Sequence, residues 1–136
     1  ISLHNMIPNE RQEIMPIEKA YKIEDVIELL KQYDWTGQRR LTFEYIVFKN
    51  LNDDYRHIFS LVSNLSDIEC RINLIRFHTI PNTIFQQADD KDMIKIRDIL
   101  TSKGLIATIR ASRGEDILAA CGLLSTKKLL SLPVKN

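Results

Sequence analysis

Cysteine is scarce in this sequence, and long apolar runs do not occur. The 136 residues include two cysteines, Cys70 and Cys121, too few for a disulfide scaffold or a four-thiolate metal site. No run approaches the roughly 18 apolar residues that a membrane-spanning helix needs. A glycine-rich phosphate loop, a zinc-ligand spacing, a serine-hydrolase elbow and a carboxylate dyad are also absent. We therefore expect a cytoplasmic protein with no membrane anchor.

The composition is that of a globular domain. Apolar residues make up 44% and charged residues 27% of the chain, and the formal net charge is +1. These values exclude a collagen, a coiled coil and a mostly disordered chain, and the length fits about one domain. The chain opens with Ile1-Ser2-Leu3-His4, without an initiator methionine and as if within a strand. We therefore expect a fragment of a longer protein.

Strand-like and helix-like patterns alternate along the chain. β-Branched and aromatic residues predict strands over residues 41–48, 70–77 and 105–109, and a further strand at the very start. Apolar residues at helical spacing predict helices over residues 23–33, from about Asn52 or Asp53 as cap to Leu65, and over 90–102 before Gly104. A short helix from Pro8 should end before Pro16, because proline lacks the amide hydrogen.

This alternation predicts an α/β fold in which parallel strands alternate with helices packed outside the sheet. Four strands do not close a barrel, for which about eight is the familiar number. An open half-barrel leaves exposed edges and one bare apolar face, which promote association. We therefore expect the chain to self-associate.

Polar residues follow several of the predicted strands. Parallel α/β folds bind ligands at the carboxyl ends of their strands. His4, His78, the loop over residues 49–54 and the segment after Ile109 all lie there in the predicted order. The two histidines are candidate ligand contacts, and the alternative is that each is an ordinary polar residue at a strand end.

Glu44 stands in the middle of an otherwise apolar strand. A carboxylate at such a position needs a partner or a polar cavity, because burying an unpaired charge is costly. We weigh two interpretations equally: a residue that lines a cavity, and a member of an ion pair inside the barrel, with Arg76 as the candidate partner.

Cys121 is flanked by small residues, in Ala119-Ala120-Cys121-Gly122. Small neighbours allow a second molecule to approach the sulfur, and Arg110 and Arg113 could lower the pKa of the thiol. The alternative is a small buried apolar residue, the commoner role of a free cysteine. Cys70 opens a strand and is interpreted as structural.

The end of the chain is biased towards positive charge. From residue 103 onward, acidic residues are outnumbered by basic ones: Lys103, Arg110, Arg113, Lys127, Lys128 and Lys135 against Glu115 and Asp116. A phosphate backbone would favour this segment, and a solvated basic face is the alternative.

Several motifs together resemble one family. They are Ser2-Leu3-His4 with Pro8-Asn9-Glu10, then Ile14-Met15-Pro16-Ile17, Thr42-Phe43-Glu44-Tyr45 and Leu51-Asn52-Asp53, and finally Arg113-Gly114-Glu115-Asp116-Ile117 with Ala119-Ala120-Cys121-Gly122. In this order, over residues 1–124, they resemble the radical SAM adenine-C2 methyltransferases of rRNA and tRNA, the RlmN/Cfr family.

The resemblance implies a fold and a chemistry. The fold would be the C-terminal half of a partial (β/α)6 barrel over residues 1–124, followed by a basic tail over 125–136. One S-adenosylmethionine would methylate a cysteine matched by Cys121. A second would be cleaved at a [4Fe-4S] cluster, and the resulting 5′-deoxyadenosyl radical would take a hydrogen atom from the methyl group on that sulfur. The methylene radical so formed would then add to C2 of an adenine. The substrates implied are 23S rRNA and a tRNA adenine next to the anticodon.

The resemblance also assigns residues. Ser2, Leu3 and His4 match a segment that contacts S-adenosylmethionine, and His78 stands where many members have an asparagine with the same role. Arg110, Arg113 and Glu44 are candidate substrate contacts or supports.

The family's cluster-binding cysteines and its second catalytic cysteine match nothing in this chain and should lie upstream. The chain alone is therefore expected to hold no cluster and to be inactive. Two alternatives remain: a related C8-specific resistance methyltransferase, and a non-catalytic RNA-binding or scaffold half-barrel.

Overall fold

The computed structural model describes residues 1–34, 41–78 and 84–110. Its elements follow the predicted alternation, in the order α1 (Pro8–Ile14), η1 (Pro16–Lys19), α2 (Ile23–Gln32), β1 (Leu41–Val47), α3 (Tyr55–Leu65), β2 (Cys70–Arg76), α4 (Asp90–Ser102) and β3 (Ile106–Arg110). Apart from the strand predicted at the very start, the predicted strands and helices within these ranges are confirmed to within a few residues. Cys121, Arg113 and the tail lie outside the described residues, so the predicted boundary at residue 124 stays a prediction.

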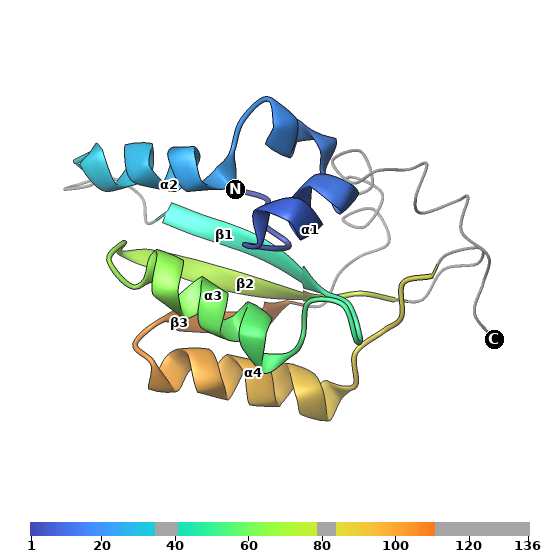
Figure 1. Cartoon of the computed structure of the whole chain (residues 1–136). Helices are drawn as coiled ribbons and strands as arrows, with labels where there is room; N and C mark the ends of the chain where they lie inside the picture. Colours follow the sequence, from blue (N-terminus) through green and yellow to red (C-terminus); the bar gives the residue numbers. More distant parts are fainter. Residues whose placement is uncertain (35–40, 79–83, 111–136) are drawn as a thin grey trace.

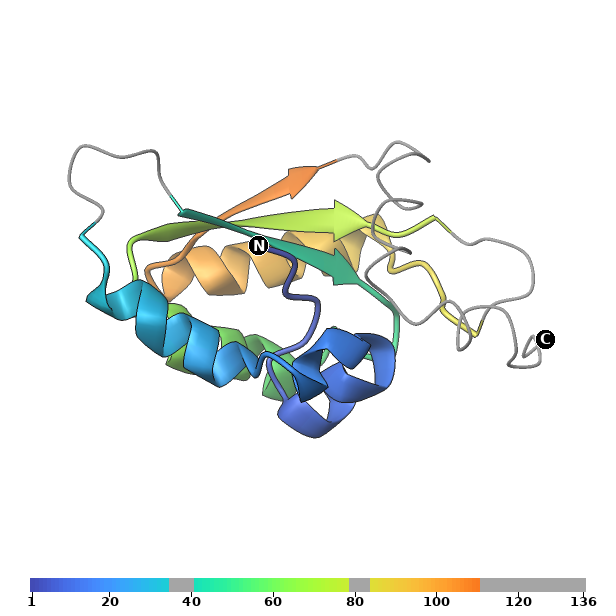
Figure 2. The ribbon, with the colours of Figure 1, turned by 90° about the horizontal axis from the view of Figure 1, so that it is seen from above.

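The three strands form one parallel sheet in the order β1-β2-β3 (Figure 1). Helix α3 connects β1 to β2 and helix α4 connects β2 to β3, as a parallel sheet requires. The described helices all lie on one side of the sheet (Figure 2). The predicted α/β fold is therefore confirmed.

The core lies between the sheet and the helices. Alternate residues of a strand point to opposite faces, so every second residue of β1 is buried on the helix side: Leu41, Phe43, Tyr45 and Val47. Helix residues that include Ile27, Leu61, Leu65, Met93, Ile96 and Leu100 pack against them. A second cluster of buried residues includes Ile46, whose side chain lies on the opposite face of β1, so that face is covered near its carboxyl end.

The first residues form less of a strand than predicted. Ser2 makes a single isolated parallel bridge to Glu44, with backbone bonds of 2.8 Å from Leu3 N to Glu44 O and 2.7 Å from Glu44 N to Ile1 O. The pairing stops at His4, whose φ of 57° turns the chain away from β1. The fourth strand is therefore reduced to this short segment at the edge of β1.

The helix ends show one correct prediction and one error. Gly104 follows α4 with a φ of +91°, as a glycine stop should. The cap of α3, however, is Asp54, whose side chain accepts a hydrogen bond from the backbone nitrogen of His57. Asn52 and Asp53, the residues predicted for this role, lie before it, and Asn52 has a different task.

Candidate functional site

The face of the sheet away from the described helices, called the helix-free face below, carries a row of polar side chains. Glu44, Asn73 and Thr108 stand opposite one another on β1, β2 and β3. Asn73 Nδ2 donates to Glu44 Oε1 at 3.1 Å, and Thr108 Oγ1 donates to Asn73 Oδ1 at 2.9 Å. The expectation of a bare apolar face is therefore wrong for this part of the sheet.

Glu44, at one end of this row, has a carboxylate oxygen that accepts no hydrogen bond from the described residues. Its Oε1 lies 3.7 Å from Arg110 Nη1, while its Oε2 is buried and has no hydrogen-bond partner among the described residues. A buried acceptor without a donor is costly, so this oxygen is suited to a hydrogen-bond donor on a bound molecule. Glu44 thus combines an ion pair to Arg110 with one unused acceptor, and its interpretation as a cavity-lining residue stays a prediction.

The ion pair suggested between Glu44 and Arg76 is wrong. Arg76 stands opposite Val47 in the register, so it points to the other face of the sheet from Glu44. Arg76 Nη2 instead lies 2.7 Å from Asp90 Oδ1, at the start of α4. The cation nearest to Glu44 among the described ion pairs is Arg110.

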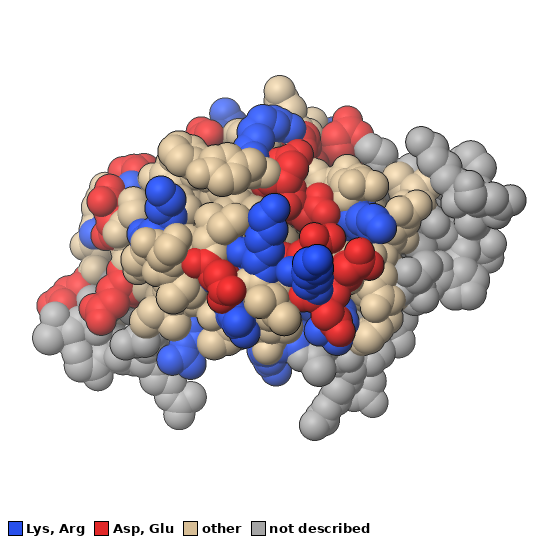
Figure 3. Space-filling view, turned by 90° about the horizontal axis from the view of Figure 1, so that it is seen from below, with Lys and Arg blue, Asp and Glu red and all other residues tan. Residues whose placement is uncertain are grey.

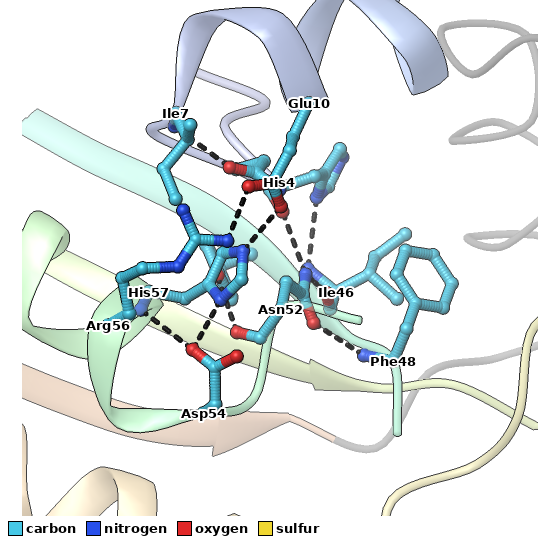
Figure 4. Close-up of polar contacts among 11 residues, drawn as sticks. His4, Ile7, Glu10, Ile46, Phe48, Asn52, Asp54, Arg56 and His57 are labelled. Atoms are coloured by element: carbon cyan, nitrogen blue, oxygen red, sulfur yellow. Dashed lines mark hydrogen bonds and ion pairs between the residues drawn. The ribbon is translucent and has the colours of Figure 1, made fainter. Parts of the chain in front are cut away.

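His4 is buried at the edge of β1. The backbone of the first residues stops pairing with β1 there, and the side chain of His4 accepts the next hydrogen bond from that strand. The nitrogen of Ile46 donates to His4 Nδ1 at 2.9 Å (Figure 4). Burial, helped by the positive charges of Arg11 and the N-terminus, lowers the pKa of His4 to about 3. The imidazole is therefore neutral, and because Nδ1 accepts, Nε2 carries the proton. His4 Nε2 is buried and unpartnered among the described residues.

Asn52 completes the edge of β1. Its Nδ2 donates to the carbonyl oxygens of His4 and Ile46, both at 2.7 Å, and its Oδ1 accepts from Phe48 N at 2.8 Å (Figure 4). Asn52 is fully buried. One side-chain amide thus ties the loop after β1 to the turn at His4 and satisfies backbone groups that would otherwise be buried without partners.

His57 was not predicted from the sequence as a site residue, yet it is buried between two carboxylates. Its Nδ1 lies 2.5 Å from Asp54 Oδ1, and its Nε2 lies 2.6 Å from Glu10 Oε1 (Figure 4). Partial burial is the largest single effect and raises the pKa of each carboxyl, but the hydrogen bonds and positive charges of His57 and Arg56 together outweigh it, so both pKa values are below their ordinary values. His57 therefore links α1 to the start of α3, next to the loop after β1 that contains Asn52.

The predicted cofactor contacts are spread along the strands: Ser2 pairs with Glu44 in the middle of β1, and His4 lies beside Ile46 near the end of that strand. Ser2 is half-buried, while Leu3 and His4 are buried against β1. His78 is exposed and follows β2 by two residues, and Arg110 is the last residue of β3. Of the predicted contacts, the structure brings Glu44 and Arg110 together. Cys121 and Arg113 lie outside the described residues.

Metal binding finds no support within the described ranges. These ranges contain no group of three or more histidine, cysteine, aspartate or glutamate residues placed to hold a metal ion. The cysteine they include, Cys70, is buried at the amino end of β2, and burial raises its pKa to about 11. These residues therefore do not fit an iron–sulfur cluster, which needs several thiolates.

The outer surface mixes charges of both signs. Figure 3 shows acidic and basic side chains next to one another on the face seen from below. The ion pairs Arg76–Asp90 and Arg97–Asp98 are examples on and next to α4. None of the helices in the described parts of the chain is long and apolar enough to cross a membrane.

No protein-family model matches the chain, but individual proteins of known sequence do. It is 56% identical over 128 residues to a probable dual-specificity RNA methyltransferase RlmN from Parabacteroides distasonis, a match that covers 94% of this chain and 37% of the relative. A probable RlmN from Porphyromonas gingivalis is 51% identical over 136 residues, with 100% of this chain and 40% of the relative covered. The chain thus spans well under half the length of these relatives.

Solved structures agree with this assignment. A radical SAM methyltransferase from Sphaerobacter thermophilus superposes with a TM-score of 0.78 at 33% identity, covering 91% of this chain and 36% of the other. A domain of a pyruvate-formate lyase-activating enzyme from Bacteroides vulgatus shares the fold, with a TM-score of 0.64 at 21% identity over 81% of this chain and 65% of that chain. Over the segment that it shares with these relatives, the chain belongs to the RlmN family of radical SAM methyltransferases.

Proposed function

We propose that this chain works as part of a radical SAM enzyme that methylates C2 of an adenine in 23S rRNA and in tRNA, next to the anticodon, by way of a methylated Cys121. The observation that carries the proposal is the 56% identity over 94% of the chain to a relative named as a dual-specificity RNA methyltransferase. Because the chain spans 37% of that relative, the activity is proposed for the complete enzyme and not for this segment alone. The proposed location is the cytoplasm, where these RNAs are modified.

In this proposal S-adenosylmethionine contacts Ser2, Leu3, His4 and His78. The support is the position of His4 and His78 at or near the carboxyl ends of β1 and β2, the usual place for ligands in such folds, with Ser2 and Leu3 leading into His4. His4 adds a buried Nε2–H group that lacks an acceptor, and S-adenosylmethionine has ribose oxygens and adenine nitrogens that accept hydrogen bonds. The residues present therefore fit the group. When bound, S-adenosylmethionine supplies the methyl group and the radical that the reaction needs.

Glu44, Arg110 and Arg113 are proposed to face the substrate. Glu44 Oε2 offers an acceptor on the helix-free side of the sheet, and Arg110, next to it, offers an exposed cation. A guanidinium suits a phosphate of an RNA chain, and a carboxylate suits an amino or hydroxyl donor. Cys121 carries the methyl group in this proposal, and the [4Fe-4S] cluster is held by cysteines upstream of the segment.

The test is the modification state of RNA in cells that depend on the complete enzyme. Nucleoside analysis of 23S rRNA and tRNA should show 2-methyladenosine, which the variant Cys121→Ala should abolish. Cys70→Ala is the matched control and should retain the product, because the buried Cys70 lies at the opposite end of the strands from the site. Finding 8-methyladenosine would replace C2 by C8 as the target. Finding no modified adenine would favour the non-catalytic RNA-binding half-barrel.

A further inference from the structure

Arg11 is a buried arginine that holds the backbone of the first residues. Its Nε donates to the carbonyl oxygen of Leu3 at 3.2 Å, and its Nη2 donates to that of Ser2 at 3.1 Å. Both acceptors belong to the segment that runs beside β1 and ends at His4. The planar guanidinium fixes two successive carbonyls at once, which a single ammonium group does not do in the same geometry.

The remaining side of the guanidinium is held by Glu18. Arg11 Nη1 lies 3.1 Å from Glu18 Oε1, and both side chains are about 95% or more buried. Glu18 in turn accepts from the backbone nitrogen of Ile23, at 3.0 Å and 3.2 Å for its two oxygens. The start of α2, the carboxylate, the guanidinium and the carbonyls of Ser2 and Leu3 therefore form one continuous set of bonds.

This set of bonds ends at a strained residue. His4 adopts a φ of 57°, a conformation that residues with a side chain seldom take. Such strain persists only where the surroundings impose it, and it concentrates at ligand sites. Around His4 the surroundings are Arg11 on one side, through Ser2 and Leu3, and Asn52 and Ile46 on the other. The outcome is an imidazole whose Nδ1 is occupied and whose buried Nε2–H is not.

We propose that Arg11 is a positioning residue, which, with Glu18, holds residues 2–4 so that His4 presents its Nε2–H to an acceptor atom of a bound ligand. The acceptor is an oxygen or a ring nitrogen; its identity as part of S-adenosylmethionine rests on the proposed function. Arg11 also places a positive charge near the imidazole, which disfavours protonation of His4 and keeps Nδ1 available to Ile46. Arg11 acts through His4 and does not itself touch the ligand.

The contrasting interpretation is an ion pair that only stabilises the core. Both interpretations predict that Arg11→Met lowers stability, because Glu18 is then left buried without its partner. They differ in the state of His4 and in ligand binding among variants that remain folded. Arg11→Lys keeps the charge but replaces the forked contacts by a single point of contact, so it separates charge from positioning.

The experiment uses this chain with S-adenosylhomocysteine as the probe. Calorimetry measures its affinity, and long-range ¹H–¹⁵N NMR measures the protonation of His4 Nδ1 and Nε2, with backbone spectra to establish folding. The wild-type chain should show one tautomer with the proton on Nε2, and binding should shift the Nε2 signal. In Arg11→Lys, and in Arg11→Met if it folds, we expect a mixture of tautomers and an affinity at least about tenfold weaker. Arg97→Met, at an exposed ion pair with Asp98, is the control and should match the wild type.

Each outcome bears on one claim. A folded Arg11 variant with wild-type affinity and a single Nε2–H tautomer would overturn the positioning role. Should both Arg11 variants unfold, Glu18→Gln tests the same role, because it keeps the shape but weakens the hold on the guanidinium; an unchanged His4 tautomer and affinity there would overturn the proposal. If S-adenosylhomocysteine binds neither the wild-type chain nor the complete enzyme, the proposed cofactor contact fails. The tautomer of His4 in the variants then still decides the role of Arg11.

Discussion

Asn52 Nδ2 donates to the carbonyl oxygen of His4 at 2.7 Å, although 48 positions of sequence separate the two residues. This bond joins the loop that follows β1 to the turn that ends the pairing of the first residues with β1. His4 also accepts a hydrogen bond from the nitrogen of Ile46. The side chains of Asn52 and His4 together therefore satisfy the backbone groups at the edge of β1, near the end of the strand where ligands bind in parallel sheets. The geometry of the proposed cofactor site therefore depends on a residue that contacts no ligand in the proposal.

Asn52→Asp should be strongly destabilising. The substitution keeps the shape of the side chain but replaces the donor by an oxygen facing the carbonyls of His4 and Ile46, in a fully buried place. We expect a loss of about 2–4 kcal/mol in the free energy of unfolding, measured by urea titration. The control is Asn64→Asp, since Asn64 donates to the carbonyl of Ser60 within the half-exposed α3 surface, and it should cost much less. Equal effects of the two substitutions would contradict the role given to Asn52.

Acid should weaken the fold through Glu10 and Asp54. Their pKa values are lowered in the folded chain, so the stability they contribute is complete above their ordinary values of about 4 and is lost as the pH falls through the lowered values. Urea midpoints measured from pH 7 down to pH 3 should therefore drop below about pH 4. The double variant Glu10→Gln with Asp54→Asn, which keeps a capping residue for α3, should show a shallower drop. An identical pH profile for both proteins would exclude these carboxylates as the cause.

Reconstitution with iron and sulfide should leave the isolated chain colourless. The proposal puts the cluster cysteines outside this segment, and the described residues offer no group that fits a metal. Absorbance spectroscopy and iron analysis after desalting measure the bound iron directly. Stoichiometric cluster binding would show that residues of this chain serve as ligands and would refute their placement upstream.

Self-association remains a prediction, now with a narrower structural basis. Among the described strands, β3 lies at an edge of the sheet, where another strand could pair, and its residue Ile106 is 42% exposed. The polar row of Glu44, Asn73 and Thr108 works against association through the sheet face. Sedimentation of the isolated chain at micromolar concentrations should show a dimer that Ile106→Lys weakens. A monomer throughout this range would rule the prediction out.

The sequence allowed most of the fold to be predicted, because its strands and helices carry strong local patterns. The bounds of α4 were predicted correctly from an apolar period that ends before Gly104. Nothing local announces the positive φ of His4, so the sequence predicts a strand where the structure has a single bridge. The sequence predicts Asn52 or Asp53 as a helix cap, because the residue type of Asn52 suits both a cap and an edge contact, and only the tertiary structure distinguishes the two.

Part of the candidate site could also be predicted from the sequence. The strand alternation placed His4, His78 and Arg110 at the carboxyl edge, and an isolated carboxylate in an apolar strand singled out Glu44. The partner of Glu44 could not be predicted, since the choice between Arg76 and Arg110 depends on the register that puts Arg76 on the opposite face. Arg11, Glu18 and His57 were missed because their roles arise from contacts across several elements and leave no local spacing to detect.

The most direct test of the account is the chemical state of Cys121 in the complete enzyme, purified from cells with its cluster assembled. Peptide mapping by mass spectrometry identifies any group attached to its sulfur. The account predicts a methyl group there, or a methylene-linked adenine adduct, with Cys70 unmodified. An unmodified Cys121 in an enzyme that methylates adenine would contradict the role proposed for this residue.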